Sequence, residues 1–183
     1  MNRSKLRQLI RRAILALVLS LPTAASAEEA RLVTTTGRMH GTLDLPETSP
    51  PFPVALIIAG SGPTDRDGNQ PFMRNDSLKQ LGRALAQRGI AGLRYDKRGI
   101  GESATAAASE ADLRLETSVS DAADWVAWLR RDTRFARVAV IGHSEGALIG
   151  LLAARRRSMP SSPSPGPGDP LRRSCESRSR SFR

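Results

Sequence analysis

The chain has 183 residues, of which 39% are hydrophobic and 25% charged, which is enough for one ordinary domain and too few for two. Its formal net charge of +10 lies at the two ends: residues 1–27 carry +5 and residues 151–183 carry +6, so the segment between them is nearly neutral. Because a nucleic-acid-binding domain carries its positive charge on the folded surface, this distribution argues against such a domain.

The first 27 residues have the pattern of an export signal. Basic residues ending at Arg12 precede the apolar run Ala13–Leu21, and Ala25-Ser26-Ala27 forms a small-residue cleavage site. This run is too short to span a bilayer, which takes about 20 residues. We therefore expect a signal peptide over residues 1–27, a mature chain that begins at Glu28, no stable membrane insertion, and a periplasmic or extracellular location.

Hydrophobic periodicity in the middle of the chain predicts four strand regions. Residues 31–45 alternate loosely and contain two glycines, which indicates an antiparallel hairpin. The apolar run Val54–Ala59 is typical of a strand buried on both faces of a parallel sheet, and Gly60–Asn69 follows it as a loop. Two further strands are expected at Ile90–Tyr95 and Val138–Ile141.

Three helices are expected between and after these strands. The first has N-cap candidates at Asn75–Ser77 and a stripe of leucines behind them. The second has its apolar stripe within residues 119–129, with Trp125 and Trp128 on the flanks, and the third covers Ala147–Arg155. This order predicts an α/β fold with a mostly parallel sheet and helices on both of its faces.

The pentapeptide Gly142-His143-Ser144-Glu145-Gly146 lies between the last predicted strand and the last predicted helix. It is G-x-S-x-G in the strand-turn-helix context in which that motif holds a serine on a sharp, strained turn. The two glycines let the strand and the helix approach each other closely. The hydroxyl of Ser144 then stands clear of the sheet.

Residues 31–155 resemble the α/β-hydrolase family, in particular bacterial esterases and serine aminopeptidase-like members. Besides the pentapeptide, two motifs carry this resemblance. Ile57–Pro63 is similar to the family's oxyanion segment, with Ala59 where a histidine often stands. Asp96–Ser103 is similar to the family's D-x-R-G-x-G-x-S loop. The resemblance implies an α/β-hydrolase fold that is truncated after the helix at Ala147–Arg155.

The same resemblance implies acyl transfer on Ser144. An exported serine hydrolase would cleave carboxylic esters, thioesters or short peptides through an acyl-enzyme on this nucleophile, and the backbone N–H groups of Ser61 and Glu145 would bind the oxyanion. Its partner would be a small-molecule acyl substrate, with no nucleic acid and no cofactor. No His, Cys or Asp cluster has ligand spacing, so we expect no metal. A plain strand-ending turn is the alternative interpretation of Gly60–Pro63.

The loop at Asp96–Ser103 has two other interpretations. The first is a structural turn, in which the acid and the arginine hold the backbone near the site and take no catalytic step. The second is the dinucleotide fingerprint G-x-G-x-x-A over Gly99–Ala104, which follows a predicted strand. That interpretation requires a helix to begin directly after the glycines, and the sequence gives no helix start there.

A serine nucleophile of this type needs an imidazole to accept its proton and a carboxylate to orient the imidazole, which in this fold follow in the order Ser, acid, His. No histidine follows Ser144 in the sequence. The two histidines present are His40, in the predicted hairpin, and His143, inside the pentapeptide. Neither position suits a general base.

From Ser158 onward the composition changes to serine, proline and arginine, which build no hydrophobic core. We therefore expect residues 28–157 to be the N-terminal part of an α/β-hydrolase domain, and residues 158–183 to be a disordered tail. The remaining acids, Asp169 and Glu176, lie in this tail. A hydrolase read out of frame is the interpretation we favour, and a genuine truncation or a native basic tail would give the same composition.

The sequence is also compatible with two alternative functions. One is a catalytically inactive remnant of a hydrolase, which lacks the acid and the histidine of the triad. The other is a polyanion-binding protein that uses its basic tail on anionic envelope surfaces or nucleic acid. A sheet that ended at Val138–Ile141 would also leave an unpaired strand edge and an uncovered apolar face.

Overall fold

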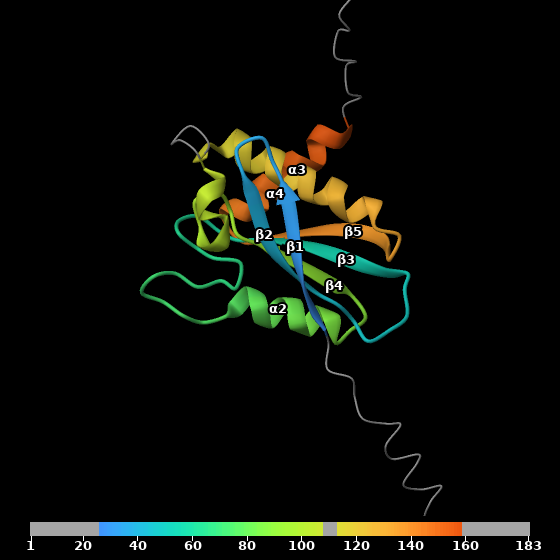
Figure 1. Cartoon of the computed structure of the whole chain (residues 1–183). Coiled ribbons are helices and arrows are strands. Elements are labelled where there is room, and N and C mark those ends of the chain that lie inside the picture. Colours follow the sequence, from blue (N-terminus) through green and yellow to red (C-terminus); the bar gives the residue numbers. More distant parts are fainter. Residues whose placement is uncertain (1–25, 108–112, 159–183) are drawn as a thin grey trace, which may run out of the picture.

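The computed structural model describes residues 26–107 and 113–158 of the chain (Figure 1). The signal peptide expected over residues 1–27 lies almost wholly outside the described residues, and so does the tail expected from residue 158. Both expectations stay predictions. Within the part of the chain that the structure describes, no helix is long and apolar enough to cross a membrane.

Five strands form one mixed sheet. They are β1 (Ala27–Val33), β2 (Arg38–Asp44), β3 (Phe52–Ile58), β4 (Ala91–Tyr95) and β5 (Phe135–Gly142), in the spatial order β1-β2-β4-β3-β5. The first two strands form the predicted antiparallel hairpin, and β2 is also antiparallel to β4. The strands β4, β3 and β5 run parallel to one another, so the carboxyl ends of β3 and β5 meet at one edge of the sheet.

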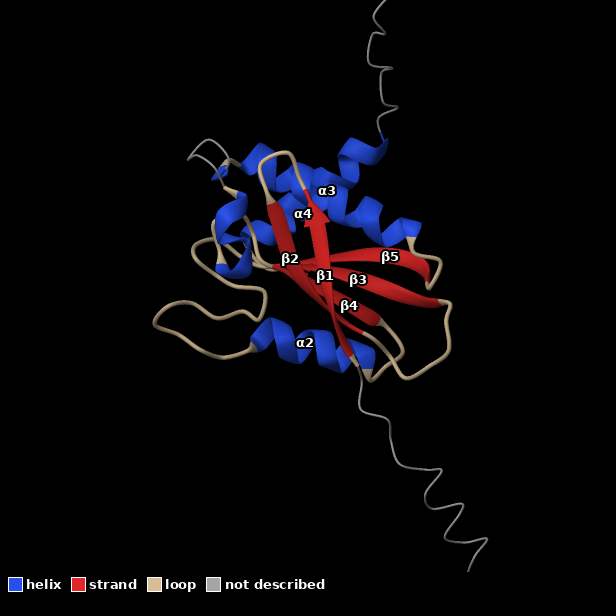
Figure 2. Ribbon diagram, viewed as in Figure 1, coloured by secondary structure: helices blue, strands red, loops and turns tan. Residues whose placement is uncertain are grey.

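Helices cover both faces of this sheet, as the alternation of strands and helices predicts (Figure 2). On one face lies α2 (Ser77–Ala86), which packs on β4 and β2. On the other face α3 (Leu115–Arg131) and α4 (Glu145–Ser158) pack against each other and against β3 and β5. A short 3-10 helix, η1 (Gly101–Ala106), follows β4. The prediction of an α/β fold with helices on both faces of the sheet is confirmed.

The central strand β3 joins the two halves of the core. Because side chains alternate along a strand, Val54, Leu56 and Ile58 belong to the cluster under α3 and α4, while Ile57 and the following Ala59 contact the α2 side. The run from Val54 to Ala59 is at most 2% exposed. The expectation of a strand buried on both faces is therefore confirmed, although the strand begins at Phe52 rather than at Val54.

The expected position of Trp125 on the flank of its helix is wrong. Its side chain is completely buried, with its ring 5.7 Å from the ring of Tyr95 and 5.6 Å from that of Trp128. Since α3 packs on the sheet and on α4 at the same time, its buried stripe is wider than one helix–sheet contact requires. Among the described residues, the Trp125 Nε1 has no hydrogen-bond partner.

The expected side-chain cap of α2 is only partly correct. Asn75 Oδ1 accepts a hydrogen bond from the Ser77 N–H at 2.9 Å, but Asp76, at the N-cap position, makes no side-chain cap bond. Its carboxylate instead accepts a hydrogen bond from the Asn69 side chain. The carbonyl of Asp67 caps the helix, because it accepts the N–H groups of Leu78 and Lys79 in the first turn of α2 at 3.1 and 3.3 Å.

Within the described residues, β5 has a neighbouring strand on one side only. Val138 and Val140 are partly exposed on this strand, and Leu151 of α4 lies beside them with 61% of its surface exposed. A cavity of about 470 Å³ runs between β5, α3 and α4, lined in part by Val138, Val140 and Leu151. The edge and the apolar face expected beyond Val138–Ile141 are therefore present.

Candidate active site

The turn from β5 into α4 holds Ser144 in a strained conformation. Its φ of +52° lies in the left-handed region, which side chains other than glycine rarely adopt. Two backbone hydrogen bonds fix the turn. The His143 N–H donates to the Ile58 carbonyl at the end of β3 at 3.0 Å, and the Ala147 N–H donates to the Ser144 carbonyl at 2.9 Å. The chain thus turns sharply at the serine, as the pentapeptide predicts.

The glycines on either side of Ser144 have no room for a side chain. A Cβ at Gly142 would collide with the backbone of Gly146 and Ala147, and a Cβ at Gly146 would lie 2.6 Å from the Ala59 carbonyl oxygen and closer still to that of Ile58. The start of α4 therefore rests directly on the end of β3. This contact requires glycine at both positions.

The end of β3 lies against the same turn. A Cβ at Gly60 would be 2.9 Å from His143 Nδ1 and 3.4 Å from Ser144 Cβ, so the segment that begins at Gly60 passes directly beside the serine. The Thr64 hydroxyl donates to the Ser61 carbonyl at 3.0 Å and holds this segment in a turn. Among the described residues, the N–H groups of Ser61 and Glu145 donate no hydrogen bond.

A cavity of about 580 Å³ opens beside Ser144. Its walls come from the ends of β3 and β5, from the loop between β3 and α2, and from the first turns of α2. Both apolar and polar side chains line it: Ile57, Met73, Leu78, Leu81 and Ile141 are apolar, and Ser61, Thr64, Gln70, Asn75, Ser77, His143 and Ser144 are polar. This composition suits an uncharged organic molecule with a polar centre.

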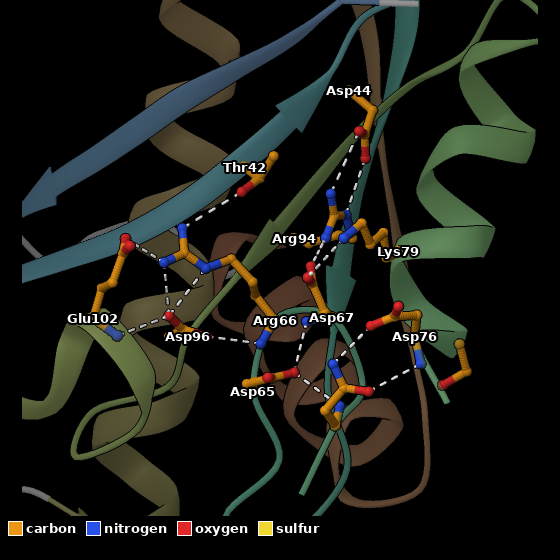
Figure 3. Close-up of polar contacts among 12 residues, drawn as sticks. Thr42, Asp44, Asp65, Arg66, Asp67, Asp76, Lys79, Arg94, Asp96 and Glu102 are labelled. Atoms are coloured by element: carbon orange, nitrogen blue, oxygen red, sulfur yellow. Dashed lines mark hydrogen bonds and ion pairs between the residues drawn. The ribbon is translucent and has the colours of Figure 1, made fainter. Parts of the chain in front are cut away.

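Hydrogen bonds to its own backbone hold the loop that walls the cavity. Asp65 Oδ1 accepts the Asp67 N–H at 2.9 Å (Figure 3) and the Asn69 N–H at 2.8 Å. Asn69 Oδ1 accepts the N–H groups of Asn75 and Asp76 at 2.9 Å. Short polar side chains favour turns of this kind because they replace missing backbone partners. The loop expected at Gly60–Asn69 is present and ordered.

Arg66 ties this loop to the end of β4. Its backbone N–H and its Nε donate to the two oxygens of Asp96 at 2.7 and 3.0 Å, and its Nη2 pairs with Glu102 (Figure 3). Asp96 also accepts the Glu102 N–H at 3.1 Å. Burial raises the pKa of the Asp96 carboxyl above its ordinary value, and the hydrogen bond and charge of Arg66 oppose that rise.

A second ion pair lies deeper, between the sheet and α2. Arg94 of β4 donates through Nε to Asp44 of β2 at 3.0 Å, and its Nη1 pairs with Asp67 of the loop (Figure 3). Arg94 and Asp44 are 2% and 3% exposed. The loop is thus held at Asp67 by Arg94 of β4, and at Arg66 by Asp96, which directly follows β4.

The loop at Asp96–Ser103 behaves as a structural turn. Arg98 donates through Nε and Nη2 to the two oxygens of buried Asp121 in α3, at 2.7 Å each. The structure argues against the dinucleotide interpretation, because the chain enters a 3-10 helix instead of an α-helix after Gly99. The Glu102 N–H, which would face a pyrophosphate, already donates to Asp96.

The two histidines lie in different surroundings. His143 Nδ1 sits beside Gly60, where it fills the space that a side chain would take. His40 Nδ1 lies 3.2 Å from Glu29 and 3.7 Å from Glu102, and these three groups could offer ligand atoms to a metal ion. Both carboxylates are already paired, Glu29 with Arg31 and Glu102 with Arg66. We therefore assign this cluster no function.

Sequence reasoning missed the charged residues that fix the site. Arg66, Arg94 and Lys97 each reach a partner that lies 27 or more residues away along the chain. Local periodicity carries no signal for such pairs. The only available hint was the unusual presence of arginine in the buried strand β4 and in a loop rich in aspartate.

Comparisons with known proteins agree with this geometry. The model of a family described as serine aminopeptidase, S33, matches residues 75–162. Esterase EstD of Thermotoga maritima is 34% identical over 122 residues, which make up 66% of this chain and 28% of the esterase. The match therefore spans little more than a quarter of that relative.

Solved structures share the arrangement of the elements. A serine hydrolase without a lid from Xanthomonas campestris superposes with a TM-score of 0.55 at 25% identity, over 75% of this chain and 59% of the hydrolase. A dienelactone hydrolase from Anabaena variabilis gives a TM-score of 0.57 at 21% identity, over 74% of this chain and 60% of that protein. The chain spans less than two thirds of each.

Proposed function

We propose that this chain, which has the fold of an α/β-hydrolase, is part of an exported serine hydrolase that cleaves carboxylic esters through an acyl-enzyme on Ser144. Thioesters and short peptides share the same acyl chemistry and belong to the same proposal. The observation that carries it is the left-handed backbone conformation of Ser144, which lies between β5 and α4 and lines a cavity with apolar and polar walls. Strain of this kind at a cavity is typical of functional residues.

In this proposal the Ser144 hydroxyl attacks the carbonyl carbon of the substrate. The carbonyl oxygen becomes an oxyanion, and the backbone N–H groups of Ser61 and Glu145 stabilise it. The serine proton passes to a base and then to the leaving group, after which water releases the acyl group. The position of Gly60 against the turn supports the role of Ser61, because it brings that segment beside the nucleophile.

The base remains unassigned. The His40 imidazole contacts Glu29, and the His143 imidazole lies beside Gly60. Among the described residues, neither imidazole makes a hydrogen bond with Ser144. An inactive remnant of a hydrolase is therefore the second candidate. The two candidates differ in whether Ser144 of this chain is reactive.

Covalent labelling by a fluorophosphonate tests the reactivity of Ser144. We expect the probe to add one phosphonyl group, detected by intact mass, and peptide mapping to place it on Ser144. Ser144→Ala should abolish the label, since the attacking oxygen is gone. Ser61→Ala is the matched control and should still be labelled, because its proposed contribution comes from the backbone N–H. Label that persists in Ser144→Ala would exclude this nucleophile, and no label in the wild type would favour the remnant.

We also propose that the chain is exported and that cleavage follows Ala27. The support is the basic and apolar sequence before Ala25-Ser26-Ala27. Cleavage there would shorten β1 by a single residue, since that strand runs from Ala27 to Val33. We expect N-terminal sequencing of the secreted protein to begin at Glu28. A protein that stays in the cytoplasm with residues 1–27 attached would contradict export.

A further inference from the structure

Lys97 contacts both segments that carry the proposed oxyanion donors. Its Nζ donates to the Gly60 carbonyl at 2.6 Å and lies 3.3 Å from Glu145 Oε2. The Lys97 side chain is 13% exposed, so water screens its bond to the Gly60 carbonyl weakly, whereas the Glu145 side chain is 42% exposed and its contact with Lys97 is screened more strongly. A charge-assisted bond of this length is among the stronger hydrogen bonds in proteins. One cation thus joins the end of β3 to the start of α4.

The peptide that Lys97 holds is the one that carries the Ser61 N–H. In a trans peptide the C=O of one residue and the N–H of the next point in opposite directions within one plane. A cation fixed on the Gly60 oxygen therefore fixes the direction of the Ser61 N–H, which points away from Lys97. Withdrawal of electrons toward the cation also makes that N–H a stronger donor, because hydrogen bonds along a peptide polarise one another.

The backbone of Lys97 is itself well fixed. The preceding Asp96 is buried and held by Arg66 and by the Glu102 N–H, and the Asp96 N–H donates to the His40 carbonyl at 2.9 Å. The Lys97 carbonyl accepts the Ile100 N–H at 3.1 Å. The lysine thus reaches across from a rigid strand end.

We propose that Lys97 is a positioning residue for the oxyanion donors: it holds the Gly60–Ser61 peptide so that the Ser61 N–H faces the substrate carbonyl, and it holds Glu145 at the start of α4. This inference rests on the proposed function. Through Lys97, its second residue, the loop at Asp96–Ser103 would then orient the oxyanion donors in addition to forming a structural turn.

The test compares the rate of fluorophosphonate labelling in the full chain at several probe concentrations. Lys97→Met keeps the length of the side chain and removes its charge. We expect the maximal labelling rate to fall by about 10- to 100-fold, less than the 10²- to 10³-fold typical when an oxyanion donor itself is lost. The half-saturating probe concentration should stay unchanged, because the donor acts on the transition state. Lys97→Arg, which keeps a cation, should recover most of the rate.

Arg88→Met is the matched control, since Arg88 is an exposed cation that donates to the Ala84 carbonyl at 2.9 Å on α2. It should label like the wild type. If Lys97→Met labels as fast as the wild type, the inference is overturned and the proposed function stands. A loss of rate in Arg88→Met as large as in Lys97→Met would also overturn it.

A wild type that does not label would overturn the proposed function, and amide NMR then decides the inference. We expect the order parameter of the Ser61 N–H to fall from about 0.85 in the wild type to below about 0.6 in Lys97→Met. The order parameter of Leu56, in the middle of β3, should not change. A Ser61 amide that stays rigid in Lys97→Met would overturn the inference.

Discussion

Gly146→Ala is expected to destabilise the fold by about 3 kcal/mol or more, a large part of the total stability of a domain of this size. The added Cβ would press into the carbonyl oxygens of Ile58 and Ala59, and backbone atoms cannot rotate away as a side chain can. Either α4 must lift from the sheet or β3 must shift. Urea denaturation followed by circular dichroism measures the loss.

Gly62→Ala is the control for this substitution. Gly62 has a φ of +74°, but a Cβ there would meet nothing within 4 Å. Its cost is therefore the conformational one alone, about 1 kcal/mol. A loss in Gly146→Ala no larger than that in Gly62→Ala would show that α4 does not rest on the end of β3 as described.

Arg94→Met is expected to destabilise the protein by about 3–5 kcal/mol, because it leaves the buried carboxylate of Asp44 without its cation. It also removes the ion pair between Arg94 and Asp67, which is one of the two ties of the loop that walls the cavity, while the tie from Arg66 to Asp96 stays. Denaturation measures the first effect. Faster limited proteolysis between Gly60 and Asn75 would report the second.

The double variant Arg94→Met with Asp44→Leu separates burial of charge from packing. Replacing both members of a buried pair by apolar residues is often neutral, so most of the lost stability should return. Arg31→Met removes an exposed partner of Glu29 and should leave the denaturation midpoint unchanged. A double variant as unstable as Arg94→Met would mean that the arginine acts through its shape and not through its charge.

The elements that the sequence predicts correctly are those with a strong local pattern. The run Val54–Ala59 has no polar residue and lies between Pro53 and Gly60, a pattern typical of a short strand that is covered on both faces. The pentapeptide at Gly142–Gly146 has one steric solution, a sharp turn with glycines on both sides of the serine. Local periodicity and local sterics are therefore enough for the order of strands and helices and for the position of Ser144.

Tertiary structure decided the rest, because the remaining features depend on residues that are distant in the chain. The Trp125 side chain is completely buried because α3 packs against α4 as well as against the sheet. The cap of α2 comes from the carbonyl of Asp67, which the loop brings to the helix. Lys97 contacts Gly60 and Glu145 because the parallel strands β4, β3 and β5 end at one edge of the sheet. Long-range pairing of this kind leaves no periodic mark in a sequence, so only the folded chain reveals it.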